Sequence, residues 1–469
     1  MRLARLVIPA LRWNADTGFA HELPRIEAAL ALGVGGFIIF GGPAQEIRYL
    51  TAELARVAGR PLLIGSDLER GAGQQVAGLS ELPPPAALAS LDDPRVARWA
   101  GELTAGEALS VGINWVFAPV ADLDVVPENP IVQTRSFGDD PARVAGLVAA
   151  WVDGCESTGA IACAKHYPGH GRTTRDSHAE LPVVEADAAR LRSQDELPFR
   201  AAIDAGVGSV MTAHVAYPAL DPLGRPATLS PPILSRLRHE CGFEGLVVTD
   251  ALIMEGARGA GDAPAAVRAL RAGCDLLLYP PDPAETALAL EHAVAAGDLP
   301  RPQVEASLAR YERALGRAGA PRGGSPAPHA RGPFEGPDAL ADALLGRDPL
   351  RGPPPSLRFP LEIVVVDDDV GGPFPPNPSD LVERELGDRA GTGGSRVVLA
   401  FAEPRGWKGR AGFGAESRRR LAAAAGADLV VLFGHPRLAA EIPGEAPVLV
   451  AWHRQALMQR AVARWLAAR

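Results

Sequence analysis

The feature that most constrains the fold is a regular alternation along about the first 320 of this chain's 469 residues. Short, almost wholly apolar runs recur between alanine-rich stretches that have helical spacing. There are eight such runs, at residues 6–10, 36–40, 61–66, 115–120, 160–165, 209–214, 246–249 and 276–279. Such runs are typical of strands buried on both faces of a parallel sheet. Eight strand–helix units predict an α/β fold, a (β/α)8 barrel of the TIM type; an open doubly wound sheet is the alternative.

The composition changes after residue 318. Proline, glycine and arginine dominate residues 319–358, which predicts a linker with a short helical patch near residues 338–345. Beyond it, we expect strands and helices to alternate again. The expected strands are residues 361–366, 397–401, 429–433 and 448–452, and the expected helices are residues 415–425 and 454–468. The sequence therefore predicts a barrel over residues 1–318 and a small α/β domain over residues 359–469.

Charge and hydropathy limit the partners. A formal net charge of −9 argues against binding to nucleic acid or to an anionic membrane surface. Arg5, Pro9 and Arg12 interrupt the apolar N-terminal stretch, so it does not form a signal-peptide core. The sequence has no apolar run of about 18 residues, the length that spans a membrane. We expect a cytoplasmic monomer or homodimer, with the second domain packing against the barrel or mediating dimerisation.

Polar residues follow five successive apolar runs. In a barrel of this kind, catalytic groups gather where strands end and loops begin. The residues in question are Asp67, Glu69 and Arg70 after the third run; Asp122, Asp124, Asn129 and Arg135 after the fourth; Lys165 and His166 at the end of the fifth; His214 at the end of the sixth; and Asp250 after the seventh. This succession predicts a shared polar site.

The loop 165–178 carries the strongest chemical pattern. It is rich in turn formers and polar side chains, and it holds His166, His170 and His178, with His214 following the next run. Asp176 and His178 are two residues apart, so the carboxylate can accept a proton from one imidazole nitrogen and leave the other for acid/base work. Asp250 has two interpretations: it points into the barrel mouth, or it caps the helix that follows.

The motifs resemble those of a known family. Lys-His-Tyr-Pro-Gly-His-Gly, starting at Lys165, continues into Asp-Ser-His at residues 176–178. Gly-Phe-Ile-Ile-Phe-Gly-Gly, Ala-Pro-Val-Ala-Asp-Leu-Asp, Arg-Ser-Phe-Gly-Asp-Asp-Pro, Met-Thr-Ala-His-Val and Val-Val-Thr-Asp-Ala-Leu accompany it. Over about residues 5–315, the chain resembles glycoside hydrolase family 3, in the branch of bacterial β-N-acetylglucosaminidases (β-N-acetylhexosaminidases). One block departs: Asp67-Leu-Glu-Arg-Gly-Ala-Gly-Gln-Gln-Val replaces a pattern closer to Asp-Gln-Glu-Gly-Gly-Arg-Val.

The resemblance implies a reaction and a set of roles. It implies retaining hydrolysis of a terminal β-linked N-acetylglucosamine through a covalent glycosyl-aspartate, with no metal or organic cofactor. The implied nucleophile is Asp250, and the implied acid/base is His178 with Asp176 as its partner. The implied sugar-binding residues are Asp67, Arg135, Lys165 and His166, with Met211 and His214 lining the pocket.

Several alternatives stay open. Within the family, these are a β-glucosidase or β-xylosidase, and a phosphorylase that transfers the sugar to phosphate. Outside it, a barrel hydrolase could use the clustered histidines as metal ligands, although their spacing fits no zinc signature. The last alternative is a non-catalytic relative that binds sugar. The resemblance points to peptidoglycan recycling, with muropeptide-derived sugars as substrates and chitin-derived sugars as the competing source.

Overall fold

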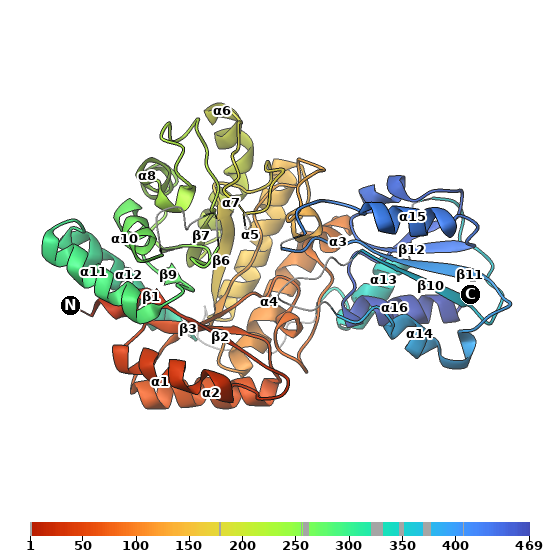
Figure 1. Cartoon of the computed structure of the whole chain (residues 1–469), viewed down its shortest axis with the longest axis horizontal. Coiled ribbons are helices and arrows are strands. Elements are labelled where there is room, and N and C mark those ends of the chain that lie inside the picture. Colours follow the sequence, from red (N-terminus) through yellow and green to blue (C-terminus); the bar gives the residue numbers. More distant parts are fainter. Residues whose placement is uncertain are drawn as a thin grey trace.

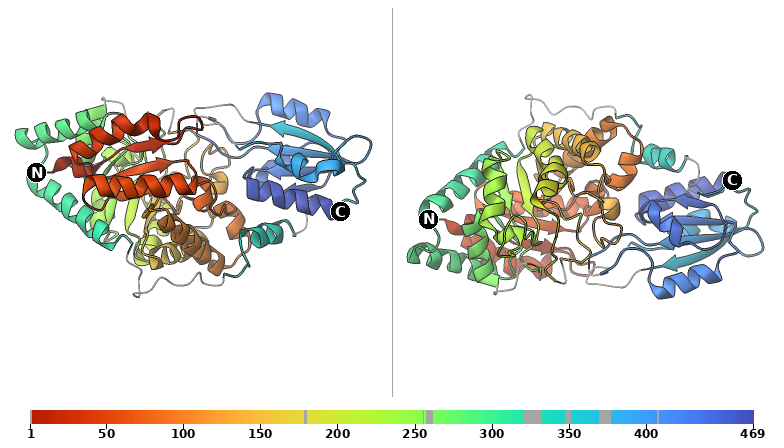
Figure 2. Two further views of the ribbon diagram at one scale, coloured as in Figure 1. Left: turned by 90° about the horizontal axis from the view of Figure 1, so that it is seen from below. Right: turned by 90° about the horizontal axis from the view of Figure 1, so that it is seen from above.

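A computed structural model shows an elongated molecule with two main parallel β-sheets, one toward each end of the chain (Figures 1 and 2). The structure describes residues 2–177, 180–254, 256, 262–319, 332–346, 351–368, 377–406 and 408–469. The first sheet and its helices come from the residues before 320, and the second sheet comes from the residues after 361. Figure 2 shows the N-terminus and the C-terminus at opposite ends of the long axis.

The first sheet is curled and wholly parallel, and its seven strands follow one another in chain order. They are β2 (Ala10–Arg12), β3 (Gly36–Phe40), β4 (Leu63–Ser66), β5 (Trp115–Val116), β6 (Ile161–Tyr167), β7 (Ser209–Thr212) and β8 (Leu246–Val248). A separate parallel pair joins β1 (Val7–Ile8) to β9 (Leu277–Leu278). Val248 also forms a bridge with Leu276, directly before β9. The α/β class that the sequence predicts is therefore confirmed.

Each of the eight predicted runs contains a strand, but only the run 36–40 has the same bounds as its strand, and two runs depart further than by fraying at the ends. The run 6–10 is interrupted at Pro9, which separates β1 from β2. The predicted strand 115–120 ends at Val116, before Pro119. Proline has no backbone N–H to give to a strand ladder, which accounts for the break at Pro9.

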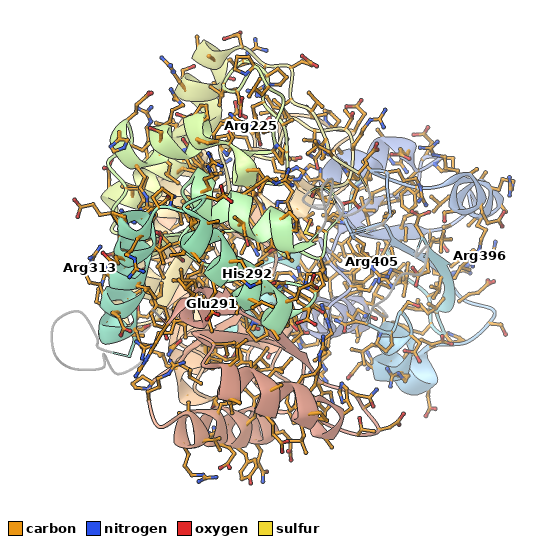
Figure 3. All side chains as sticks on the ribbon, turned by 60° about the vertical axis from the view of Figure 1, so that its left-hand side comes forward. Arg225, Glu291, His292, Arg313, Arg396 and Arg405 are labelled. Atoms are coloured by element: carbon orange, nitrogen blue, oxygen red, sulfur yellow. The ribbon has the colours of Figure 1, made fainter. Side chains whose placement is uncertain are left out.

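Helices cover the outside of the first sheet (Figure 1). They are α1 (Leu23–Leu32), α2 (Ala44–Ala58), α3 (Pro85–Ser90), α4 (Pro94–Ser110), α5 (Pro141–Ser157), α6 (Ala188–Arg190), α7 (Leu197–Asp204), α8 (Pro231–His239), α10 (Asp262–Ala272), α11 (Pro283–Ala296) and α12 (Arg301–Arg317). Short 3-10 helices are η1 (Leu3–Leu6), η2 (Ala20–Glu22), η3 (Ala72–Gln74), η4 (Gln133–Arg135) and η6 (Ala227–Leu229), and η5 (Leu191–Asp195) is a π-helix. Apolar side chains such as Phe37, Trp115 and Phe199 fill the core. Exposed polar side chains such as Glu291 and Arg313 cover the helices (Figure 3).

The second sheet has four parallel strands in chain order: β10 (Glu362–Asp367), β11 (Arg396–Phe401), β12 (Leu429–Phe433) and β13 (Val448–Val450). One face packs on α13 (Pro337–Leu345), α14 (Leu381–Leu386) and α16 (Ala456–Ala467), and the other packs on α15 (Ala415–Ala423). Two 3-10 helices, η7 (Gly387–Arg389) and η8 (Pro436–Glu441), complete the region. Each of the four predicted strands and both predicted helices coincides with an observed element.

The predicted linker is described only in part. Residues 320–331 and 347–350 lie outside the described residues, and the predicted helical patch near 338–345 corresponds to α13. Within the described part of the chain, no helix is long and apolar enough to cross a membrane.

Candidate active site

The carboxyl ends of β4, β5, β6 and β8 bring charged side chains together. Lys165 and His166 lie within β6, Asp67 directly follows β4, and Asp250 comes two residues after β8. Asp122 follows the short strand β5. Because parallel strands end at the same edge of a sheet, residues far apart in the chain meet here.

Lys165 and Arg135 form a buried ion-pair network with two carboxylates. Lys165 Nζ lies 2.7 Å from Asp67 Oδ1 and 2.8 Å from Glu69 Oε1. Arg135 reaches both oxygens of Glu69, at 2.7 and 2.9 Å. Burial opposes ionisation of Glu69, but Arg135 and Lys165 outweigh it and hold its pKa well below the usual range. Burial likewise lowers the pKa of Lys165, but Asp67 and Glu69 raise it above its ordinary value, so the network stays charged.

His166 links two further acids. Its Nδ1 lies 2.7 Å from Asp122 Oδ2, and its Nε2 lies 4.0 Å from Asp250 Oδ2. The backbone N–H groups of His166 and His170 donate to Asp122 Oδ1 at 3.1 and 2.7 Å. Burial opposes ionisation of Asp122, but its contacts with His166 and His170 lower its pKa, so this carboxylate is ionised and fixes the orientation of the His166 ring.

Asp250 is only partly buried, with 18% of its side chain exposed. Its Oδ1 accepts a hydrogen bond of 2.7 Å from the backbone N–H of Ala251. His214 contacts the same turn: its Nε2 lies 3.2 Å from the carbonyl oxygen of Ala251, and its Nδ1 lies 2.8 Å from Thr228 Oγ1. Met211 is buried in β7 and is in register with Lys165 on β6. His214 and Met211 thus lie next to the cluster but inside the protein.

The loop after β6 is held from within by His170. Its Nδ1 lies 3.0 Å from Thr173 Oγ1, and its Nε2 lies 3.0 Å from Ser177 Oγ. Burial lowers the pKa of His170 to about 4, so the ring is neutral at ordinary pH. Asp176 is buried, but His178 lies outside the described residues, so the predicted Asp176–His178 pair stays a prediction.

The structure adds members that the sequence did not assign a role. Glu69 and Asp122 follow their strands and were visible as strand-end acids, but the sequence does not show which cations they bind. The C-terminal region adds Arg437, which bonds to Asp124, and His435, whose Nε2 lies 3.0 Å from Asp124 Oδ2. Among the described residues, no group of three or more His, Cys, Asp and Glu side chains is arranged to hold a metal ion.

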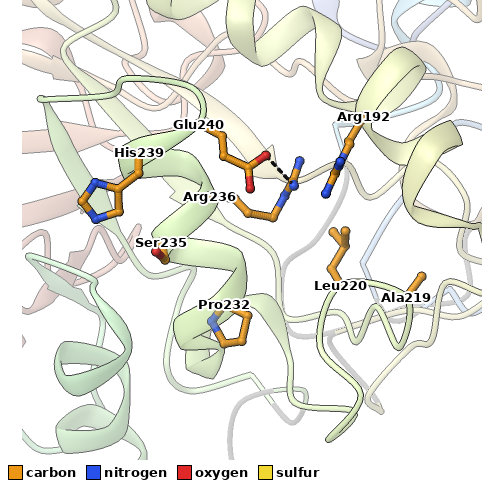
Figure 4. A pocket seen from close by; sticks show the side chains of 8 residues that line it. All are labelled: Arg192, Ala219, Leu220, Pro232, Ser235, Arg236, His239 and Glu240. Atoms are coloured by element: carbon orange, nitrogen blue, oxygen red, sulfur yellow. Dashed lines mark hydrogen bonds and ion pairs between the residues drawn. The ribbon is translucent and has the colours of Figure 1, made fainter.

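A hollow of about 330 Å³ lies elsewhere, beside α8. It is lined by Arg192, Ala219, Leu220, Pro232, Ser235, Arg236, His239 and Glu240. Figure 4 shows Arg236 bonded to Glu240 at its edge, at 2.7 Å. None of these residues belongs to the strand-end cluster, so the hollow is a separate feature.

Comparison with known proteins defines the family. Residues 25–314 match the glycosyl hydrolase family 3 N-terminal domain. Proteins named Beta-hexosaminidase from Nitrosomonas eutropha and Chromobacterium violaceum are each 37% identical, over 56% and 61% of this chain and 78% and 81% of their own. The structure of a family 3 β-N-acetylglucosaminidase from Paenibacillus sp. is similar at a TM-score of 0.83 and 26% identity, over all of this chain and 96% of that one. The chain belongs to glycosyl hydrolase family 3. It is a glycoside hydrolase.

Proposed function

We propose that the chain is a retaining β-N-acetylhexosaminidase that removes terminal β-linked N-acetylglucosamine. The observation that carries this proposal is Asp250, a partly exposed carboxylate at the end of β8, next to a cluster of buried charged side chains. The names of the relatives and of the Paenibacillus structure support the choice of sugar.

Asp250 is the proposed nucleophile. An attacking carboxylate must be ionised and fixed in direction. The N–H of Ala251 holds Oδ1, and His166 Nε2 faces Oδ2 at 4.0 Å. Attack on carbon 1 gives a glycosyl-aspartate, and water then hydrolyses this ester with net retention.

His178 is the proposed acid/base, with Asp176 as its partner. It protonates the leaving oxygen in the first step and takes a proton from water in the second. Histidine suits both steps because its ordinary pKa lies close to neutral pH. A carboxylate partner keeps one ring nitrogen occupied, so proton exchange takes place at the other.

The buried ion pairs are proposed to bind the sugar hydroxyls. Asp67 has 32% of its side chain exposed, whereas Lys165 has 3%. Asp67 is therefore best placed to accept hydrogen bonds directly, and Glu69 holds Lys165 and Arg135 in position behind it. His166 contacts the sugar through Nε2, because its Nδ1 is committed to Asp122. Met211 and His214 shape the floor of the site.

We also propose that residues 1–318 form one catalytic (β/α)8 barrel. The β1–β9 pair and the Val248–Leu276 bridge support closure, because they connect the two sides of the curled sheet. Residues 359–469 form the proposed second domain, with residues 319–358 as the linker. The hydrophobic clusters around β10–β13, which are separate from the main core, support this division.

The test compares 4-nitrophenyl N-acetyl-β-glucosaminide with 4-nitrophenyl β-glucoside. We expect kcat/KM for the N-acetyl sugar to be higher by about 10²-fold or more. Asp250→Asn should lower it by about 10⁴-fold, and His178→Ala by about 10²-fold, with unchanged circular dichroism. Preference for the glucoside, or an Asp250→Asn enzyme with activity near that of the wild type, would refute the proposal.

A further inference from the structure

The first part of the loop after β6, residues 169–172, lies between two neighbouring segments, and we call it the stem of the loop. Gly169 has φ +129°, and a Cβ there would lie 3.0 Å from the Cβ of Asp195. A Cβ on Gly171 would lie 1.7 Å from the carbonyl oxygen of Leu123, so only glycine fits. Tyr217 Oη donates to the carbonyl oxygen of Gly169 at 2.9 Å. The stem is thus fixed in contact with η5 on one side and with the loop after β5 on the other.

Arg172 fastens this stem to η5. Its Nε lies 2.8 and 3.0 Å from the two carboxylate oxygens of Asp195, and its Nη2 donates to Gln194 Oε1 at 2.7 Å. The exposed fractions are 13% for the Arg172 side chain and 1% for that of Asp195, so solvent screens the pair little. Two consecutive residues of η5 therefore bind one guanidinium group.

The element that carries these two residues is itself unusual. In η5, the N–H of Glu196 donates to the carbonyl oxygen of Leu191 at 2.9 Å, five residues back. Such π-turns are rare and often lie at functional positions. Arg172 lies between two of the motifs that carry the family resemblance, Lys-His-Tyr-Pro-Gly-His-Gly and Asp-Ser-His, and belongs to neither.

The anchored stem leads directly to the proposed acid/base. Arg172 precedes Asp176 by four residues and His178 by six. His170, two residues before Arg172, holds Ser177 from inside the loop. The outer contact at Arg172 and the inner contact at His170 together restrain both sides of the segment that ends at Ser177.

We propose that Arg172, bound by Asp195 and Gln194 of η5, is a positioning residue for proton transfer by the loop. This inference rests on the proposed function, because it takes His178 as the acid/base. Arg172 touches no reacting atom. It fixes the stem that leads to the acid/base, and a displacement of about 1 Å is enough to slow a proton transfer strongly.

Leaving groups of different basicity separate positioning from general damage. Protonation matters for phenyl N-acetyl-β-glucosaminide, whose leaving group is a basic anion, and matters little for the 2,4-dinitrophenyl analogue, whose leaving group departs readily as the anion. The main variant is Arg172→Met combined with Asp195→Asn, which leaves no unpaired buried charge. We expect its kcat/KM to fall about 10-fold or more for the first substrate and less than about 2-fold for the second.

Three further variants keep the result interpretable. Gln194→Met removes one uncharged contact of Arg172, so the loss of kcat/KM should again be larger for the first substrate than for the second, but smaller than in the main variant. Arg172→Lys keeps the positive charge and should retain more activity than the main variant. Arg310→Met breaks a partly buried ion pair with Asp275, before β9 and remote from the loop, and should lower both substrates equally or not at all. Equal losses for both substrates in the Arg172 variants would overturn the inference.

His178→Ala separates this inference from the proposed function. If His178→Ala shows no dependence on the leaving group, the acid/base assignment itself fails. If His178→Ala shows the dependence and the Arg172→Met/Asp195→Asn variant does not, only the positioning role of Arg172 fails.

Discussion

The carboxyl ends of the strands carry similar residues in the two main parallel sheets, but the contacts that these residues make differ. In the second sheet, charged side chains end or follow every strand: Asp367, Glu403, His435 and Arg454. Arg454 bonds to Glu403 and lies 2.7 Å from Asp367, and Lys408 lies 2.8 Å from Asp368. Burial raises the pKa of Asp368, but its contacts, among them that with Lys408, lower this pKa below the ordinary value. These carboxylates are paired with cations of the same region, whereas His435 contacts Asp124 of the first region.

In the first sheet, the same kind of edge leaves carboxylates within reach of a ligand. Lys165 is buried between Asp67 and Glu69, yet Asp67 and Asp250 stay partly exposed. A charged strand end is therefore not enough to indicate catalysis. Exposure does not separate the two edges either, because Asp367 of the second sheet is bound by the buried Arg454 and still has 27% of its side chain exposed. The first edge differs in bringing charged side chains from the ends of four strands into one cluster around Lys165 and His166.

The largest expected effect comes from breaking the ion-pair network around Lys165 in the first sheet. Lys165→Met keeps a side chain of similar length but leaves Asp67 without its cation and Glu69 with Arg135 alone. We expect kcat/KM to fall about 10³-fold and the free energy of unfolding to fall by about 3 kcal/mol, because a buried charge loses its partner. Steady-state kinetics and urea unfolding measure the two. Activity within 10-fold of the wild type would show that this network does not serve the reaction.

The matching change in the second sheet should affect stability alone. Arg454→Met leaves Glu403 buried without its cation, and burial already raises the pKa of Glu403. We expect a loss of about 3 kcal/mol in the free energy of unfolding, with kcat/KM changed less than about 3-fold at temperatures where the enzyme is folded. A large loss of activity in an enzyme that stays folded would mean that the second edge takes part in catalysis, and the contrast would disappear.

The strands and the polar edge could be predicted from sequence because both leave a local pattern. A strand buried on both faces is apolar throughout, and the residue after it is polar. Partner choice has no local pattern. Lys165 and Asp67 are 98 positions apart, and Arg437 and Asp124 are 313 apart, so only the folded chain shows that they meet. The roles of Glu69 and Asp122 were missed for the same reason.

The smallest expected effect lies where the two regions meet. Arg437 and His435, beyond β12, both bind Asp124, which is two residues from the Asp122 that orients His166. Arg437→Met leaves His435 in contact, so we expect KM to rise about 2- to 5-fold with kcat nearly unchanged.

The matched control for this contact is Arg384→Met, which removes an exposed ion pair with Asp380 within the second region and should change neither constant. Combining Arg437→Met with Asp124→Asn tests the contact itself. If the pair acts on the site, the double variant should be no worse than Asp124→Asn alone, because the interaction is already lost. Fully additive effects on KM would instead mean that Arg437 and Asp124 act independently, and that the second sheet stabilises the first without adjusting its site.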